Sequence, residues 1–264
     1  MCAKFNRLLA RLIPEGAIKE GIRASYYSLY YNRKHFKENN FRVFYKKGHF
    51  EYEIDDGVTF KAYENMADEL KRSLFGYCEK YKLNRGDVVV DCGAYFGEFT
   101  LYAAKAVDEE GAVIAFEPDP QICDRLKKNV ELNELSNVII VNKGVWSEDK
   151  ALAFTSDDVR GHSFLLDRHD AAALELPVVS LDSELERLGA RRVNFIKMDV
   201  EGAELEAIRG AEKTLKYNNA QLAIASYHVV NGKKTYMELE KILSGFGYRV
   251  ETSNPGHLTT YASK

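Results

Sequence analysis

Residues 87–97 read DVVVDCGAYFG, and this stretch decides how the chain folds. Three valines end at Asp91, which is typical of a central parallel strand buried on both faces. Gly93 and Gly97 follow, and glycines here permit a tight turn and let a ligand approach the backbone closely. A strand, a glycine turn and a helix in this order predict an α/β unit with a ligand site at the turn.

The same alternation of strand and helix continues to the end of the chain. We predict further strands at 112–117, 137–142, 193–199, 220–226, 248–251 and 257–261. Strands that alternate with helices predict an α/β fold with a doubly wound, mostly parallel sheet. In such a sheet the ligand lies outside the carboxyl ends of the strands. Asp91, Glu117 and Asp199 each end a strand, so we expect these three acids at that edge.

The first 84 residues follow a different pattern. Apolar residues recur at helical spacing before residue 32, and aromatic residues alternate with charges over 41–63 around two glycine turns. We expect one or two helices, a small antiparallel meander and a helix over 69–82. The chain is therefore predicted to divide into an appendage, residues 1–84, and a main domain, residues 85–264.

Positive charge is concentrated at the start of the chain. The whole sequence has a net charge of -3, which argues against a nucleic-acid-binding protein and against an acidic disordered chain. Residues 1–50 hold 11 Lys or Arg and 3 Asp or Glu. Two interpretations stay open: a basic amphipathic element that contacts anionic lipid at a membrane surface, and helices packed on the main domain with their lysines in solvent.

The cysteines and apolar runs indicate a reducing compartment. Cys2, Cys78, Cys92 and Cys123 form no CxxC pair, and a domain of this size needs no disulfide, so we expect reduced thiols. No apolar run approaches the roughly 20 residues of a membrane-spanning helix, and the N-terminus lacks the apolar centre of a signal peptide. The predicted location is cytoplasmic.

The acid before the glycine turn indicates which cofactor the turn holds. A dinucleotide motif would have its first glycine where this chain has Asp91, and this acid would repel a pyrophosphate. The ammonium and sulfonium of S-adenosylmethionine suit an acid better. Glu117, 26 residues later, is placed to accept hydrogen bonds from both ribose hydroxyls. We therefore predict S-adenosylmethionine as the cofactor and disfavour NAD.

Recognisable motifs lie in residues 88–105, 116–120, 161–164, 177–182 and 209–211 and in the box IKMDVEGAEL at 196–205. Together they resemble the FkbM family of S-adenosylmethionine-dependent methyltransferases. This resemblance implies a class I Rossmann-like methyltransferase fold and O-methylation, often of sugar hydroxyls or other small secondary products. It also implies the cofactor contacts: Asp91, Gly93, Ala94 and Gly97 at the methionine end, Glu117 at the ribose, and Asn142 near the adenine.

An alcohol acceptor has to lose a proton during methyl transfer, which calls for a general base within about 3 Å. Asp199, Glu201 and His228 are the candidates at the sheet edge, and a histidine is the natural base near neutral pH. Members of the family commonly carry an acid before this histidine, whereas this chain has Ser226. The candidates also suit magnesium or manganese, but no tight motif such as HExxH is present, so we predict no obligatory metal.

These observations predict an O-methyltransferase that acts on a hydroxyl of a small molecule or glycan, including a lipid-linked sugar. A non-catalytic S-adenosylmethionine-binding protein is the alternative, for which Ser226 is the only hint, and an NAD-dependent oxidoreductase is a third. Residues 146–176 are expected to form a substrate lid. We expect no nucleic-acid partner, and no motif specifies the acceptor or the oligomeric state.

Overall fold

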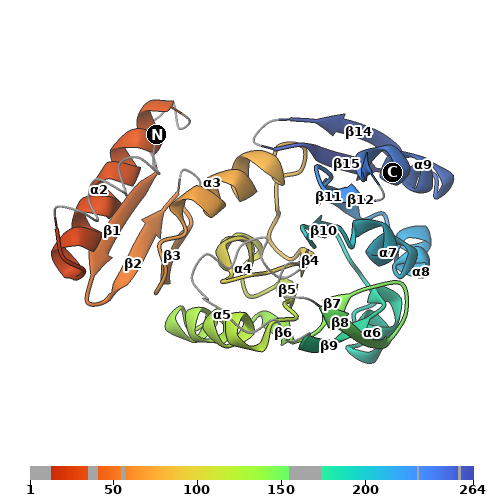
Figure 1. Ribbon diagram of the computed structural model, residues 1–264, viewed down its shortest axis with the longest axis horizontal. Helices are drawn as coiled ribbons and strands as arrows, with labels where there is room; N and C mark the ends of the chain where they lie inside the picture. The colour runs from red at the N-terminus through yellow and green to blue at the C-terminus, as the bar shows by residue number, and fades with distance from the viewer. Residues whose placement is uncertain (1–12, 35–40, 55–56, 155–173, 231, 255–256) are drawn as a thin grey trace.

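A computed structural model describes residues 13–34, 41–54, 57–154, 174–230, 232–254 and 257–264 (Figure 1). Its central layer is a seven-stranded sheet in the order β14-β15-β11-β10-β4-β5-β6. The strands are β4 (Val88–Cys92), β5 (Ala112–Phe116), β6 (Val138–Val141), β10 (Phe195–Met198), β11 (Gln221–Ala225), β14 (Arg249–Ser253) and β15 (Thr259–Ser263). β15 pairs antiparallel with both β11 and β14, and the other four strand pairs of this sheet are parallel, so the doubly wound, mostly parallel sheet is confirmed.

The chain changes its direction of travel across the sheet between β4 and β10. From β4 it runs outward through β5 and β6, and it later returns to pair β10 with the other side of β4. Cys92 and Met198 are the last paired residues of these two strands. Their carboxyl ends form the topological switch point, where ligand sites lie in open α/β sheets.

Successive side chains of each strand enter the cores on opposite faces of the sheet. Val89 belongs to one hydrophobic cluster and Val90 to the other. The first cluster includes α4 (Glu98–Val107) and α5 (Pro120–Leu132), and the second includes α6 (Leu181–Arg187), α7 (Glu204–Arg209), α8 (Glu212–Tyr217) and α9 (Tyr236–Gly245). Asp119 caps α5, because its carboxylate accepts hydrogen bonds from the N–H groups of Gln121 and Ile122.

Glycines let other segments approach the ends of two helices. The helix predicted over 69–82 is α3 (Ala67–Gly76), and a Cβ on Gly76 would lie 2.5 Å from Cε1 of His257. The chain after β10 forms two helices, α7 and α8, which are separated at Gly210. A Cβ on Gly210 would lie 2.0 Å from the carbonyl oxygen of Trp146, so another loop's backbone packs into the break.

The predicted appendage, residues 1–84, is called the N-terminal extension below. Its described part includes a helix packed on a meander (Figure 1). α2 (Ala17–Lys34) lies against β1 (Arg42–Lys46), which pairs with β2 (His49–Glu53) and then β3 (Thr59–Ala62). One hydrophobic cluster runs from α2 through this meander into α4 and α5, so the extension shares a core with the sheet. Residues 1–12 lie outside the described residues, and the domain division at residue 84 stays a prediction.

Part of the segment expected to form a lid, residues 146–176, lies in a small sheet. This sheet consists of β7 (Gly144–Val145) just before the segment, β8 (Lys150–Phe154) within it, and β9 (Leu174–Val179), which begins in it. The rest of the expected lid, residues 155–173, lies outside the described residues. A short hairpin of β12 (Val229–Val230) and β13 (Lys233–Lys234) follows β11.

Two features of the described residues bear on the compartment. Cys92 and Cys123 are buried thiols outside any disulfide. Within the same ranges no helix has the length and apolar character needed to cross a bilayer.

Candidate active site

The glycine turn follows β4 at the switch point. Gly93 has a φ of +80°, and a Cβ there would lie 1.9 Å from the carbonyl oxygen of Asp199. The turn and the end of β10 therefore touch backbone to backbone, which only glycine permits. The N–H groups of Gly93 and Ala94 both donate to the carbonyl oxygen of Phe116, at 3.0 and 2.9 Å. These bonds fasten the turn to β5.

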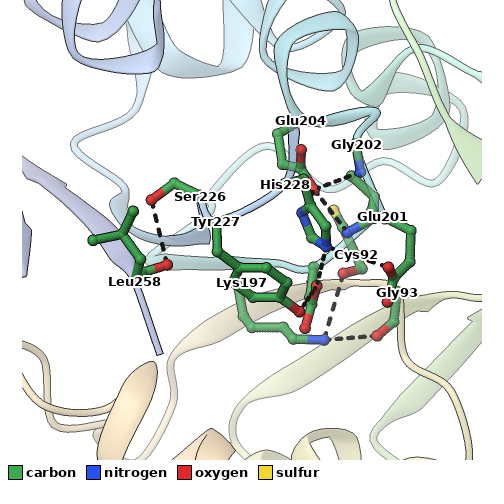
Figure 2. A network of polar contacts seen from close by, with 12 residues as sticks. Cys92, Gly93, Lys197, Glu201, Gly202, Glu204, Ser226, Tyr227, His228 and Leu258 are labelled. Carbon is green, nitrogen blue, oxygen red and sulfur yellow. Dashed lines mark hydrogen bonds and ion pairs between the residues drawn. The ribbon is translucent and has the colours of Figure 1, made fainter. Parts of the chain in front are cut away.

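Asp91 is wholly buried behind this turn. Its carboxylate oxygens lie 2.9 Å from Nζ of Lys197 and 2.6 Å from the Thr100 hydroxyl. Lys197 also donates to the carbonyl oxygen of Gly93 at 2.6 Å (Figure 2). Burial alone would lower the pKa of Lys197, but Asp91 and other nearby carboxylates raise it above its ordinary range. Asp91, predicted to contact the cofactor directly, thus stands behind Lys197, which lines the cavity.

Glu117 follows β5 and is held in one orientation. Its Oε2 accepts a hydrogen bond from the N–H of Tyr95 at 2.9 Å, and its Oε1 accepts one from Asp119 at 3.0 Å. Burial raises the pKa of Glu117 to about 7, and the two backbone donors offset this only in part. Each carboxylate oxygen has a further lone pair, so the group can also accept hydrogen bonds from the two hydroxyls of a ribose.

These residues border a cavity of about 620 Å³ at the switch point. Two of the six predicted cofactor residues, Gly93 and Glu117, are among its described lining residues. The other four are not among them: Asp91, Ala94, Gly97 and Asn142. Asn142 donates to the carbonyl oxygens of Glu117 and Pro118, at 2.8 and 3.1 Å. Its amide nitrogen therefore fastens the segment after β5, and its predicted place near the adenine stays a prediction.

An acidic cluster surrounds His228 beyond the ends of β10 and β11, as Figure 2 shows. Nδ1 of His228 lies 2.8 Å from Glu204, and Nε2 lies 3.2 Å from Glu201 and 3.8 Å from Asp199. Burial alone would lower the pKa of His228, but these carboxylates raise it to about 10, so the ring is a cation at neutral pH. The structure thus brings the three predicted catalytic residues together and adds Glu204.

Glu204 is the last residue of the DVEGAE box, residues 199–204, and holds the turn that places the acidic cluster. Its side chain is fully buried, and Oε1 accepts hydrogen bonds from the N–H groups of Val200 and Gly202 at 3.3 and 3.1 Å. Glu201 and Gly202 have φ angles of +53° and +102°, so the chain turns sharply after β10. The box is visible in the sequence, but the role of its last acid was not predicted.

Asp199 is also tied to the N-terminal extension. The Tyr77 hydroxyl donates to Oδ2 of Asp199 at 2.8 Å, and the Tyr227 hydroxyl lies 3.5 Å from Oδ1. Burial and the charge of Asp199 raise the pKa of Tyr77 well above its ordinary range, so the phenol keeps its proton. Tyr77 follows α3, and nothing in its local sequence pointed to this contact.

A second cavity, of about 990 Å³, adjoins the first. The two cavities share residues from several elements: Glu69, Arg72, Tyr95, Glu98, Glu201, Tyr227 and His257. The extension supplies much of the remaining lining, which is aromatic and charged: Glu20, Arg23, Tyr45, Phe50, Tyr63 and Glu64. These residues form no motif, so the second cavity was not predicted.

His257 joins the site from the C-terminal hairpin. Its ring packs edge-on against Tyr77 and Tyr227, with centroids 4.9 and 5.6 Å apart. Burial lowers the pKa of His257, so this imidazole is neutral near pH 7. Sequence reasoning missed it because the residue lies far along the chain from every motif.

Three side chains of the cluster form a group that could hold a metal ion. Asp199, Glu204 and His228 each offer one ligand atom, and these atoms lie within 4.8 Å of one another. Magnesium and manganese accept oxygen and nitrogen ligands of this kind. Glu204 and His228 are also paired with each other. That no metal is required stays a prediction.

The sheet order, the glycine turn and the acid after β5 define a Rossmann-like methyltransferase. The model of the methyltransferase FkbM domain matches residues 91–250, and that of protein-L-isoaspartate(D-aspartate) O-methyltransferase matches residues 4–147. The chain belongs to the FkbM methyltransferase family, as the resemblance implied. Its cofactor is S-adenosylmethionine.

Individual relatives agree with this assignment. Methyltransferase 1 of Beauveria bassiana is 30% identical over 145 aligned residues, and the match covers 47% of this chain and 58% of that protein. The hexuronic acid methyltransferase AglP of Haloferax volcanii is 26% identical over 136 aligned residues, and this match covers 50% of this chain and 53% of that protein. The chain thus spans less than two thirds of either relative.

A solved structure shows the same fold. The FkbM methyltransferase of Methylobacillus flagellatus superimposes with a TM-score of 0.55 at 17% identity, covering 97% of this chain and 57% of that one.

Proposed function

We propose that this protein transfers a methyl group from S-adenosylmethionine to a hydroxyl oxygen of a small molecule or glycan. One observation carries the proposal: the cavity lined by Gly93 and Glu117 meets, beside the Asp199 cluster, a second cavity large enough for an acceptor. That a relative is a hexuronic acid methyltransferase supports a glycan acceptor.

The residues at the switch point fit the cofactor. Glu117 would accept hydrogen bonds from its ribose hydroxyls, and the bare backbone of Gly93 would let its methionine portion pass close to the turn. S-adenosylmethionine, when bound, supplies an electrophilic methyl group on its sulfonium sulfur. The remaining work of this chain is to position the acceptor hydroxyl and to remove its proton.

Asp199 is the proposed general base. It ends β10 on the lining of the first cavity, and the hydroxyls of Tyr77 and Tyr227 point at its carboxylate. These two donors orient the carboxylate toward an acceptor entering from the second cavity. The proton of the acceptor hydroxyl would pass to Asp199 as the new oxygen–carbon bond forms.

His228, Glu201 and Glu204 are proposed to position Asp199. Both ring nitrogens of His228 face carboxylates, Nδ1 toward Glu204 and Nε2 toward Glu201, so neither offers a lone pair to an acceptor. The protonated ring of His228 would hold the turn after β10 and stabilise the negative charge of Asp199. This cluster works without an obligatory metal in our proposal, and we expect turnover to survive treatment with EDTA.

The second cavity suits a polyhydroxylated acceptor. Tyr45, Phe50 and Tyr63 offer aromatic faces for the apolar side of a sugar ring, while charged groups beside them can bond its hydroxyls. Arg23 pairs with Glu20 and Arg72 with Glu69, so these charges are partly balanced within the cavity wall.

The contacts of Ser226 remove the reason for considering a non-catalytic S-adenosylmethionine-binding protein. Ser226 is wholly buried, and its hydroxyl accepts a hydrogen bond from Thr260 at 2.9 Å, which joins β15 to the end of β11. Its role is structural, while the catalytic candidates around it are assembled. The NAD-dependent oxidoreductase is set aside because the chain belongs to a methyltransferase family.

Calorimetry followed by turnover tests the proposal. We expect S-adenosylhomocysteine to bind and NAD not to bind. Incubation with S-adenosylmethionine and a panel of free and lipid-linked sugars should then give a product heavier by one methylene group, methylated on oxygen. Asp199→Asn should slow turnover by about 10²-fold or more while keeping cofactor affinity, whereas the control Glu206→Gln on α7 should change neither. Methylation on nitrogen or carbon, or full turnover by Asp199→Asn, would contradict the proposal.

Peripheral membrane contact is proposed for the extension. Ile18, Ile22 and Leu29 lie on one side of α2 and are 77%, 36% and 55% exposed. Together with the excess of basic residues in 1–50, this apolar stripe suits an anionic lipid surface. The expected cytoplasmic location and the absence of a nucleic-acid partner stay predictions.

A further inference from the structure

Two opposite charges face the first cavity from neighbouring helices. Glu98 is the first residue of α4, and Arg72 lies on α3 in the N-terminal extension. The two helices pack against each other, and both side chains line the wall that the two cavities share. The reaction proposed above uses neither charge.

Glu98 is buried, and one of its two carboxylate oxygens lacks a hydrogen-bond partner within the described part of the chain. The residue is 7% exposed, and among the described residues its Oε2 has no hydrogen-bond donor. A buried, unpaired carboxylate oxygen is costly. Burial raises the pKa of Glu98 to about 7, with Lys197 opposing and Asp91 adding to the rise. A cationic group brought into the cavity would remove this cost.

Arg72 has donors to offer an anion in the same cavity. One Nη lies 3.3 Å from Glu69, and the side chain is 40% exposed. A guanidinium carries five N–H donors, so this single contact leaves most of them for a ligand. Its planar fork matches the two oxygens of a carboxylate.

We propose that Glu98 and Arg72 bind the amino-acid end of S-adenosylmethionine, Glu98 its α-ammonium and Arg72 its α-carboxylate. The zwitterion would find an acid and a base on adjacent helices, whereas Asp91 is already engaged by Lys197 and Thr100. The inference rests on the cofactor and on neither the acceptor nor the reaction. Since Arg72 lies outside the FkbM-matched residues 91–250, the extension completes the cofactor site.

Two ligands that differ only at this end provide the test. S-adenosylhomocysteine carries the amino-acid end, whereas 5′-methylthioadenosine keeps the adenosine and the thioether but lacks it. Titration calorimetry on the full chain should show that Glu98→Gln and Arg72→Gln each weaken S-adenosylhomocysteine about tenfold or more, because a charged hydrogen bond is lost. Binding of 5′-methylthioadenosine should change less than about threefold in either variant.

Two matched variants control for general damage. Glu117→Gln should weaken both ligands by similar factors, because both contain the ribose. Arg125→Gln removes an arginine that pairs with Glu64 away from the first cavity, and both affinities should stay at the wild-type values. Should Glu98→Gln or Arg72→Gln fail to fold by circular dichroism, Glu98→Asp and Arg72→Lys keep the charge but move it, and the same difference between ligands is expected.

The outcomes separate this inference from the cofactor assignment. Equal losses for both ligands, or unchanged affinity for S-adenosylhomocysteine in both variants, would overturn the roles of Glu98 and Arg72. Wild-type protein that binds 5′-methylthioadenosine as tightly as S-adenosylhomocysteine would do the same, because the amino-acid end would then contribute nothing. Wild-type protein that binds neither would overturn the cofactor assignment itself.

Discussion

The edge of the sheet and the N-terminal extension border the same cavities but are built from different contacts. At the sheet edge, the backbone of Gly93 meets the backbone of Asp199, and a buried ion pair joins Lys197 to Asp91. The extension contributes side-chain ends, such as the Tyr77 hydroxyl and the Arg72 guanidinium.

Because of this difference, the two regions tolerate different substitutions. A backbone contact leaves no room for a larger residue, and a buried charge cannot lose its partner without cost. A side chain that reaches in from a helix can be exchanged while the backbone stays in place. We therefore expect changes at the sheet edge to affect folding and cofactor binding together, and changes in the extension to affect stability, affinity or acceptor choice one at a time.

Gly93→Ala should have the largest effect. Its Cβ would overlap the carbonyl oxygen of Asp199 at 1.9 Å, in a backbone conformation with φ of +80°. We expect loss of S-adenosylhomocysteine binding and about 3 kcal/mol or more off the free energy of unfolding, measured with urea. Gly189→Ala is the control: at φ +71° nothing lies within 4 Å. It should cost only about 1 kcal/mol, and equal losses would contradict the contact argument.

Lys197→Met should come next, because it leaves the buried charge of Asp91 without its main partner. Breaking a buried pair from one side costs about 3–5 kcal/mol, measurable by urea unfolding. Adding Asp91→Asn should restore part of the loss. Lys216→Met, in an exposed pair with Glu212, should stay within about 0.5 kcal/mol of wild type. A double variant no more stable than Lys197→Met would argue against the pairing.

Changing pH should move cofactor affinity and stability in opposite directions. Burial raises the pKa of Glu98 and of Glu117 to about 7, and the charged groups facing them are Lys197, Asp91, Glu69 and Asp119. The ionised carboxylates bind an ammonium and hydroxyls better, so affinity for S-adenosylhomocysteine should rise between about pH 6 and 8. The folded pKa of each carboxyl group lies above the pKa of the same group in the unfolded chain. The contribution of each group to stability is therefore complete below the unfolded pKa and is lost as pH rises through about 7.

Calorimetry and urea unfolding across this range measure both slopes. The double variant Glu98→Gln/Glu117→Gln should flatten them. Slopes that persist in the double variant would assign the pH dependence to other groups.

Tyr77→Phe in the extension should have a smaller effect. It removes the 2.8 Å hydrogen bond to Asp199 and leaves the ring in place. We expect a loss of about 1.5 kcal/mol in the free energy of unfolding with little change in cofactor affinity. Tyr217→Phe, at a residue 86% exposed, should change stability by less than about 0.5 kcal/mol. A Tyr77→Phe protein as stable as the Tyr217→Phe control would remove this bond from the site.

The smallest effect on the folded protein is expected on the outer side of α2. Replacing Ile18, Ile22 and Leu29 by serine removes exposed apolar groups, so stability should stay within about 0.5 kcal/mol per site. Sedimentation with phosphatidylglycerol vesicles should nevertheless decrease severalfold. Wild-type protein that does not sediment with these vesicles would end the membrane proposal.

The sheet and its edge could be predicted because their signals are local. The strands around β4 are apolar runs of the right length, and parallel strands end at one edge, so Glu117 and Asp199 could be placed there. Because the DVEGAE box resembles that of the FkbM family, the turn after β10 could also be assigned to the site from the sequence.

The remaining contacts join residues that are distant in the sequence. Lys197 lies inside an otherwise apolar strand, and its pairing with Asp91 depends on strand register. Tyr77 and His257 reach the site only because α3 and the C-terminal hairpin pack together at Gly76. No periodicity or motif encodes such meetings, which tertiary packing decides.

The core shared between the extension and the sheet sets an order of events during synthesis. Residues of α2 and the meander leave the ribosome before the sheet, yet the cluster that covers them includes Phe195 and Tyr261. The Tyr261 hydroxyl donates to the carbonyl oxygen of Gly76, which lies far from it in the sequence. Contacts this distant in sequence form late. The aromatic face of the extension therefore stays uncovered until β15 has emerged, and a chaperone that holds it until then should raise the yield of folded protein.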